Sequence, residues 1–71
     1  MDYVSVSSSN VAAVGYESET STLGVRFLDG SEYHYFGIPQ EIFVGLQSAS
    51  SVGSYLDQNV KKAGYAYSKV G

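Results

Sequence analysis

The chain contains no cysteine, so neither disulfide bonds nor thiolate metal sites can form. It also has little charge, with 15% charged residues against roughly 25% in an average domain. Its 71 residues are close to the smallest size at which burial alone stabilises a fold. Without covalent cross-links, such a chain depends on the packing of one small core. We therefore predict a single domain over residues 1–71.

Apolar runs long enough to cross a membrane are also absent, because none approaches the roughly 18 residues that a bilayer requires. The N-terminal stretch MDYVSVSSSN has neither the basic start nor the apolar run of a secretory signal peptide. We expect a soluble protein without a membrane partner. The lack of cysteine fits a reducing compartment, so we predict a cytoplasmic location.

Positive charge is scarce in this chain. Four cations (Arg26, Lys61, Lys62 and Lys69) face seven carboxylates, and the formal net charge is −3. A protein that held nucleic acid mainly by charge would need a Lys or Arg for each of several phosphates. The sequence is instead rich in aromatic residues, with seven tyrosines and three phenylalanines. Because tyrosine has an apolar ring and a polar tip, it serves cores, interfaces and base-stacking platforms alike.

Short β-prone segments fill the N-terminal half of the chain. The segments YVSVS (3–7) and VAAVGY (11–16) are separated by the Ser-rich turn Ser7–Asn10. Two stronger strands follow at Thr22–Leu28 and Ser31–Phe36, where apolar and polar side chains alternate with period two. The pattern predicts four consecutive strands of an antiparallel sheet.

The length of the turn between the two stronger strands decides which side chains share a face of the sheet. A two-residue loop would place Tyr33 opposite Arg26. A three-residue loop, Leu28–Gly30, closed by its glycine in the left-handed region, places Tyr33 opposite Val25 and Arg26 opposite Glu32. We prefer the three-residue loop, because it gathers the apolar side chains on one face and pairs opposite charges on the other.

The three-residue loop also decides which face of the sheet Tyr35 and His34 occupy. Leu23 then faces Tyr35, so both central tyrosines lie on the core side of the sheet. His34 points away from the core. We expect it to be a solvent-facing strand residue, because no partner that would position it for catalysis is visible.

Two short helices are predicted after the sheet. Pro39 suits the first position of a helix over 39–48, because its φ is already helical and its missing N–H would have been unpaired there. Ser50 or Ser51 is a suitable N-cap for a second helix over 52–62.

The last segment returns to a strand. Gly64 suits the left-handed residue that ends the second helix, and Tyr65–Val70 again alternates with period two. The predicted fold class is α+β, with about five antiparallel strands packed against two short helices in the order β-β-β-β-α-α-β.

The ordered positions of small and aromatic residues resemble those of the KTSC domain family over nearly the whole chain. The matching positions are Val6-x-Ser8-Ser9, Gly15-Tyr16, Leu23-x-Val25-x-Phe27-x-x-Gly30-x-x-Tyr33-x-Tyr35-x-x-Ile38-Pro39, Leu46-x-x-Ala49-Ser50-Ser51-x-Gly53-x-Tyr55 and Tyr65-x-Tyr67. The family is named for the C-terminus of some lysyl-tRNA synthetases and also occurs as small stand-alone proteins in bacteria and phages. The resemblance implies RNA binding, and it makes Tyr33 and Tyr35 the family's central Tyr-x-Tyr.

Two Tyr-x-Tyr pairs are candidate ligand contacts. Tyr33 and Tyr35 are either a core pair of the sheet or a stacking surface. The same alternatives remain open for Tyr65 and Tyr67, which belong to the last strand, at an edge where half-exposure is common.

The four cations are candidate phosphate contacts. Lys61 and Lys62 complement the dipole at the end of the second helix. Together with Lys69 they are also able to form a small patch for one or two phosphates, with Arg26 as a further contact.

Ser51 and Gly53 offer a further candidate site, because a small turn that enters a helix presents free N–H groups to phosphate or carboxylate oxygens. Capping of the helix explains the serine equally well.

Catalysis is not expected. A metal site needs several His, Cys or clustered carboxylates, and the sequence has one histidine. A Ser-His-Asp set would have to combine Ser51 or Ser54 with His34 and Asp57, without a nucleophile elbow. We predict no catalytic residue, no metal and no cofactor.

The sequence therefore favours a non-catalytic module that binds a nucleotide or short RNA by tyrosine stacking and a few Lys or Arg contacts. The alternative is a protein-interaction or homo-oligomeric module, which, if phage-encoded, would act on host factors or sequester a nucleotide signal. Low charge and surplus tyrosine are also interface traits. The last strand leaves a sheet edge that favours self-association.

Overall fold

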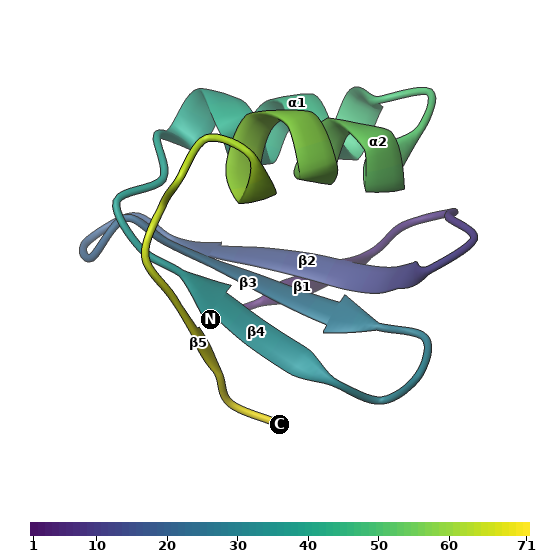
Figure 1. Ribbon diagram of the computed structural model, residues 1–71, viewed down its shortest axis with the longest axis horizontal. Coiled ribbons are helices and arrows are strands. Elements are labelled where there is room, and N and C mark those ends of the chain that lie inside the picture. The colour runs from purple at the N-terminus through teal and green to yellow at the C-terminus, as the bar shows by residue number, and fades with distance from the viewer.

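A single antiparallel sheet with two helices on one of its faces makes up the protein (Figure 1). The computed structural model describes residues 1–71. The elements are β1 (Tyr3–Ser5), β2 (Val11–Glu17), β3 (Thr22–Phe27), β4 (Glu32–Tyr35), α1 (Gln40–Ser48), α2 (Val52–Leu56), the π-helical turn η1 (Asp57–Lys61) and β5 (Tyr67–Lys69). The strands lie in the order β1-β2-β3-β4-β5. The predicted α+β class and element order are confirmed.

The hairpin of β3 and β4 has the register that the three-residue loop predicts. Val25 lies opposite Tyr33, and Arg26 lies opposite Glu32. Gly30 adopts a φ of 93°, which L side chains rarely tolerate, and its N–H donates to the Phe27 carbonyl oxygen at 3.0 Å. The turn thereby places the apolar side chains of both strands on the face that the helices cover.

The core lies between this face of the sheet and the two helices. Its ten buried apolar residues come from both layers: Val11, Val14, Leu23, Val25, Tyr35, Ile38, Leu46, Val52, Leu56 and Val60. Because α1 and α2 are short, each contributes only a few side chains, and the sheet supplies half of the core. No helix in the structure has the length and apolar composition that crossing a membrane would require.

The helices differ from prediction at their ends. Pro39 is the N-cap of α1 rather than its first residue, because its ψ of 147° is extended and the helix begins at Gln40. The chain is held there by the Ile38 N–H, which donates to the Ser21 carbonyl oxygen at 2.9 Å. Ser51 caps α2, as one of the two predicted serines, by accepting a hydrogen bond from the Ser54 N–H.

The predicted helix over 52–62 is α-helical only as far as Leu56 and then widens into η1. The Lys62 N–H donates to the Asp57 carbonyl oxygen, five residues back. The side chain of Asn59 donates to the Tyr55 carbonyl oxygen at 3.1 Å, the acceptor that an α-helix would reserve for a backbone N–H. The π-helical turn ends at Lys61.

The outer strands are shorter than predicted. β1 ends at Ser5, and β5 spans Tyr67–Lys69 within the predicted 65–70. Both are edge strands, so only one side of each is paired within the sheet. Residues 65 and 66 instead form the end of the connection from η1, which carries Gly64 at a φ of 84°, as predicted.

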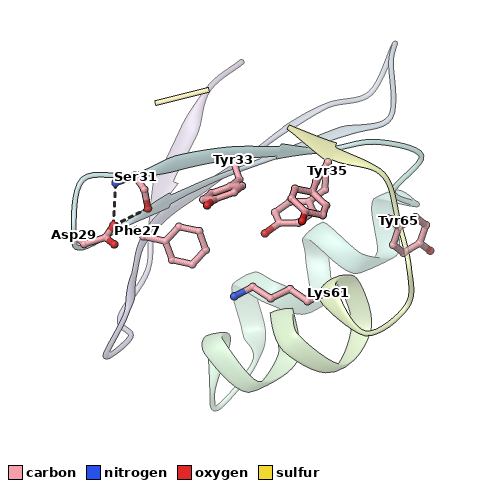
Figure 2. Close-up of a pocket in the computed structure, with 8 residues that line it drawn as sticks. Phe27, Asp29, Ser31, Tyr33, Tyr35, Lys61 and Tyr65 are labelled. Carbon is pink, nitrogen blue, oxygen red and sulfur yellow. Dashed lines mark hydrogen bonds between the residues drawn. The ribbon is translucent and has the colours of Figure 1, made fainter. Parts of the chain in front are cut away.

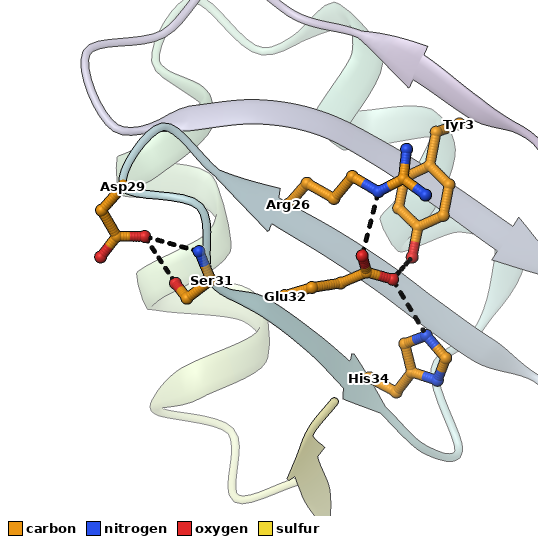
Figure 3. Close-up of polar contacts among 6 residues, drawn as sticks. All are labelled: Tyr3, Arg26, Asp29, Ser31, Glu32 and His34. Atoms are coloured by element: carbon orange, nitrogen blue, oxygen red, sulfur yellow. Dashed lines mark hydrogen bonds and ion pairs between the residues drawn. The ribbon is translucent and has the colours of Figure 1, made fainter. Parts of the chain in front are cut away.

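The face of the sheet away from the helices is covered in part by the N-terminal residues. Gly15 and Gly24 are directly paired, and the Tyr3 ring and Met1 lie against them. Tyr3 donates to Glu32 at 2.8 Å, and the Arg26 guanidinium lies 3.8 Å from the centre of the Tyr3 ring (Figure 3). Sequence reasoning did not predict this contact.

Candidate functional site

A pocket of about 450 Å³ lies between the helix-side face of β3, β4 and β5 and the end of η1 (Figure 2). Its lining residues are Phe27, Asp29, Ser31, Tyr33, Tyr35, Lys61, Tyr65 and Tyr67. The volume falls within the roughly 300–1,000 Å³ that is common for small-molecule sites. The structure therefore brings both predicted Tyr-x-Tyr pairs and one predicted lysine to a single pocket.

A row of aromatic rings forms one wall of the pocket. Tyr35 lies opposite Tyr67 in the sheet register, and their ring centroids are 5.8 Å apart. Tyr33 stands in the middle of the row, 6.1 Å from Tyr67 and 5.8 Å from Phe27. The strand alternation explains the row, since these residues all point to the helix side.

The tyrosines of the row differ in exposure. Tyr35 is 4% exposed and belongs to the core, whereas Tyr67 is 65% exposed. Burial raises the pKa of Tyr35, and the neighbouring Tyr33 and Tyr67 raise it further. Tyr35 therefore stays protonated, and Tyr67 offers free ring surface to a ligand. The core alternative is therefore correct for Tyr35, whereas Tyr67 faces solvent and its role as a stacking surface stays a prediction.

Polar groups gather at the hairpin end of the pocket (Figure 2). Asp29 Oδ1 accepts hydrogen bonds from the Ser31 N–H at 2.9 Å and from the Ser31 hydroxyl at 2.6 Å. The hydroxyl, then the N–H, and more weakly the charge of Lys69 hold the pKa of Asp29 below its usual value. Lys61 reaches toward the same end, with Nζ 5.2 Å from the Phe27 ring centre.

The four cations divide into two groups by their partners. Arg26 Nε lies 3.0 Å from Glu32 Oε1, and Lys62 Nζ lies 3.3 Å from Asp57 Oδ2. Lys61 and Lys69 have no carboxylate partner within ion-pair distance. Lys69 lies opposite Tyr33 in the sheet and so shares its face. The two unpaired cations are thus the two on the pocket side.

The other predicted site residues lie elsewhere. Arg26 is on the opposite face of the sheet, where it contacts Tyr3 and Glu32 (Figure 3). Ser51 acts as the cap of α2, and Gly53 lies so close to Asn10 that a Cβ there would be 2.7 Å from its side-chain oxygen. These residues have local structural roles, and none of them lines the aromatic pocket.

Three pocket residues were not among the predicted site residues: Phe27, Asp29 and Ser31. Phe27 could have been predicted from the sequence, because strand alternation already placed it on the same face as Tyr33. Asp29 and Ser31 were treated only as turn residues. Their position at the pocket depends on how η1 approaches the hairpin, which local pattern does not encode.

The histidine lies on the face opposite the pocket. His34 Nε2 is 3.7 Å from Glu32 Oε2, beside Tyr3 and Arg26 (Figure 3). It points away from the core, as predicted. No group of three or more His, Asp or Glu side chains in the structure is arranged to hold a metal ion.

Similarity to known proteins extends over almost the whole chain. The family model described as the KTSC domain matches residues 7–65. A protein of Stutzerimonas stutzeri is 33% identical over 70 residues, covering 99% of both chains. A protein of Tsukamurella paurometabola is 38% identical over 56 residues, covering 79% of this chain and 84% of its own.

A solved structure shows the same fold. The crystal structure of a KTSC domain protein from Yersinia pestis superimposes with a TM-score of 0.89 at 30% sequence identity, covering 99% of this chain and 97% of that one. The resemblance inferred from the ordered small and aromatic residues is confirmed by the family match and by this structure. The chain belongs to the KTSC domain family.

Proposed function

We propose that this protein is a non-catalytic binding module that holds one nucleotide in its aromatic pocket, either free or as part of a short RNA. The observation that carries the proposal is the composition of that pocket. Four of the seven tyrosines and one unpaired lysine line it. A nucleotide has one planar apolar group and one anionic group, which matches an aromatic wall beside a single cation.

The aromatic wall is suited to a nucleobase. Tyr67 is 65% exposed, and Tyr33 next to it is only partly buried. An exposed ring held in place by neighbouring rings gives a base a flat surface at little conformational cost. Stacking of this kind contributes about 1–3 kcal/mol per base.

The cations are suited to a phosphate. Lys61 lines the pocket, and Lys69 lies on the same face of the sheet. Neither is neutralised by a carboxylate within the protein. Because the formal net charge is −3, these cations favour one or two phosphates rather than a long polyanion.

A titration of adenosine, guanosine, cytidine and uridine monophosphates and of a short single-stranded RNA, followed by calorimetry at two salt concentrations, tests the proposal. Lys61→Gln and Lys62→Gln are a matched pair, because these lysines are adjacent in the chain and only Lys61 lines the pocket. We expect Lys61→Gln to weaken binding about 3–10-fold and to reduce its salt dependence. Lys62→Gln should bind as the unmodified protein does.

Three possible results of these titrations lead to different conclusions. Stronger binding of RNA than of every mononucleotide would identify RNA as the source of the nucleotide. Absence of binding by all of these ligands at low salt would refute the proposal. Equal weakening by both lysine substitutions would indicate a diffuse charge effect and would exclude the pocket as the site.

A second candidate function, self-association or binding of another protein, is favoured by the edge of the sheet at β5. This strand has one unpaired side and carries Tyr67, which is 65% exposed, and the residue that follows the strand, Val70, is 49% exposed. Exposed apolar side chains at a free strand edge are typical of interfaces. Light scattering at low and high salt tests this candidate, which requires association that salt does not weaken.

A further inference from the structure

We propose that Asp29 recognises the hydroxyl groups of a ribose, so that the pocket prefers a ribonucleotide with free 2′ and 3′ hydroxyls over its deoxy counterpart. The inference rests on the proposed function and adds a sugar contact to it. The ligands of this class are a free 5′-mononucleotide and the 3′-terminal nucleotide of an RNA.

One oxygen of Asp29 is left without a protein partner. Oδ1 accepts both hydrogen bonds from Ser31, at 2.9 Å and 2.6 Å. Oδ2 takes part in no hydrogen bond or ion pair with the protein, although Asp29 lines the pocket. The two bonds from Ser31 fix the carboxylate in one orientation, so its free oxygen is held ready for a ligand.

Asp29 requires hydrogen-bond donors from the ligand. The Ser31 hydroxyl and N–H hold the pKa of Asp29 below its usual value, so the side chain is ionised at neutral pH. An ionised carboxylate only accepts hydrogen bonds. It repels phosphate and favours hydroxyl or amino groups, and a ribose offers two neighbouring hydroxyls.

The order of groups along the pocket favours the sugar over the base as the partner of Asp29. The exposed ring of Tyr67 is separated from Phe27 by Tyr33, with centroid distances of 6.1 Å and 5.8 Å. Asp29 lies beyond Phe27, at the hairpin end (Figure 2). A base that lies over Tyr33 and extends to the edge of Tyr67 has its sugar on the Phe27 side of Tyr33, so the part of the ligand nearest Asp29 is the sugar.

The charges near the pocket limit the number of phosphates. Lys61 and Lys69 supply two positive charges, and Asp29 supplies one negative charge close to them. A phosphate monoester carries a charge of about −1.5 to −2 near neutral pH. One phosphate matches the two lysines, whereas a triphosphate would leave excess negative charge beside Asp29. The expected ligand is a nucleoside monophosphate.

Calorimetry with a ribonucleoside 5′-monophosphate and its 2′-deoxy and 2′,3′-dideoxy analogues tests the inference on the wild-type chain, Asp29→Asn and Ser31→Ala. We expect the ribonucleotide to bind the wild type at least about 10-fold more tightly than the dideoxy analogue. Asp29→Asn should remove most of this preference and leave the affinity for the dideoxy analogue within about twofold. Ser31→Ala should reduce the preference only partly, because the N–H bond to Asp29 remains.

A comparison of two RNAs identifies whether the ribose belongs to a free nucleotide or to the end of an RNA. A short RNA with a free 3′ end should bind more tightly than the same RNA with a 3′-phosphate if a terminal nucleotide enters the pocket. Asp29→Asn is expected to fold, because the side chain is exposed and asparagine keeps an oxygen that accepts from Ser31; a thermal melt checks this.

The failure of this inference differs from the failure of the proposed function. If the ribonucleotide and its dideoxy analogue bind equally well while Lys61→Gln still weakens both, the sugar contact is wrong and the nucleotide pocket stands. A preference for guanine over the other bases that Asp29→Asn abolishes would assign Asp29 to the base and would overturn the inference. If no nucleotide binds, both proposals fall together.

Discussion

At the scale of single residues, the tyrosines divide into structural ones and pocket ones. Tyr16 stacks on Phe43 with centroids 5.5 Å apart and donates to the Ile38 carbonyl oxygen. Tyr55 occupies the space above Gly45, where a Cβ would collide with its hydroxyl. Tyr16 joins the sheet to α1, and Tyr55 joins α2 to α1. Tyr3 is structural too, because its ring covers the face of the sheet away from the helices. The four that remain are those of the pocket, and Tyr67 is the one with a largely exposed ring.

Tyr67→Ala should weaken nucleotide binding without unfolding the protein. Removing one stacking surface is expected to cost about 1–3 kcal/mol of binding free energy. Because the side chain is 65% exposed, we expect the free energy of unfolding to fall by less than about 1 kcal/mol. Calorimetry and chemical denaturation measure the two quantities.

Two variants control for that substitution. Tyr67→Phe keeps the ring and should bind as the wild type does. Phe36→Ala removes an exposed aromatic ring that does not line the pocket, and it should leave the affinity unchanged. Wild-type affinity of Tyr67→Ala would show that the base does not stack on this ring.

Glu32 makes stability depend on acid pH. Hydrogen bonds from Tyr3 and then Arg26 hold its pKa below the ordinary value of 4.5. The unfolded chain therefore binds a proton before the folded one does, so this stabilisation is present above about pH 4.5 and is lost as pH falls through the folded pKa. Burial, followed by the hydrogen bond to Glu32 and the charge of Glu32, raises the pKa of Tyr3 to about 12.

Denaturation curves of the wild type and Glu32→Gln, measured from neutral pH down to about pH 3, test this linkage. We expect the wild type to lose more stability than the variant over the acid part of the range, so that the two curves converge. The gap between them should stay constant above about pH 5. Parallel curves throughout would mean that Glu32 has the same pKa in the folded and unfolded chains.

At the scale of elements, the hairpin was predictable and the second helix was not. The register of β3 and β4 followed from the alternation of Val25 and Tyr33 and from a turn whose glycine adopts positive φ. Both signals are local in the chain. The widening of η1 depends on the Asn59 side chain, which bonds the Tyr55 carbonyl oxygen, and an α-helix with a solvent-facing asparagine fits the same sequence.

The contacts of β1 could not be predicted from residues that are close together in the sequence either. Tyr3 reaches Glu32 across two intervening strands, and the contact requires the flat surface of the paired Gly15 and Gly24. The two glycines are nine positions apart in sequence and become neighbours only through the strand register. The pattern of strand residues predicted that β1 exists, without indicating what its side chains contact.

Ser51→Ala should destabilise the fold through α2. The Ser51 hydroxyl accepts from the Ser54 N–H at 3.4 Å, a long bond, so we expect a loss near the lower end of the usual range, about 0.5–1 kcal/mol. Ser50→Ala is the matched control, because Ser50 precedes the cap and should change stability by less than about 0.5 kcal/mol. Chemical denaturation of both variants measures the difference; equal losses would assign the effect to the loop rather than to the cap.

At the scale of the whole molecule, the two faces of the sheet have different chemistry. The face away from the helices satisfies its charges internally, through Arg26, Glu32 and the Tyr3 hydroxyl. The helix side carries the core and, at the β5 end, the pocket, which Lys61 lines and whose face of the sheet Lys69 shares. A chain with so few cations thus leaves the two unpaired ones beside its exposed aromatic surface.

Sequence reasoning identified five of the eight residues that line the pocket. It named the tyrosines and Lys61, because aromatic pairs and cations are visible in any sequence. It also named Arg26, which lies on the other face, since strand alternation and the Glu32 pairing were not used to exclude it. It missed Asp29, because a turn residue becomes a pocket residue only when a distant element packs against it.

The central claim is that the row of rings from Phe27 to Tyr67 receives a planar ligand. The most direct measurement is a nuclear Overhauser experiment on the protein saturated with a nucleoside monophosphate. We predict contacts between the base protons and the ring protons of Tyr67 and Tyr33. Contacts confined to the opposite face around Tyr3, or none at millimolar ligand, would contradict the claim.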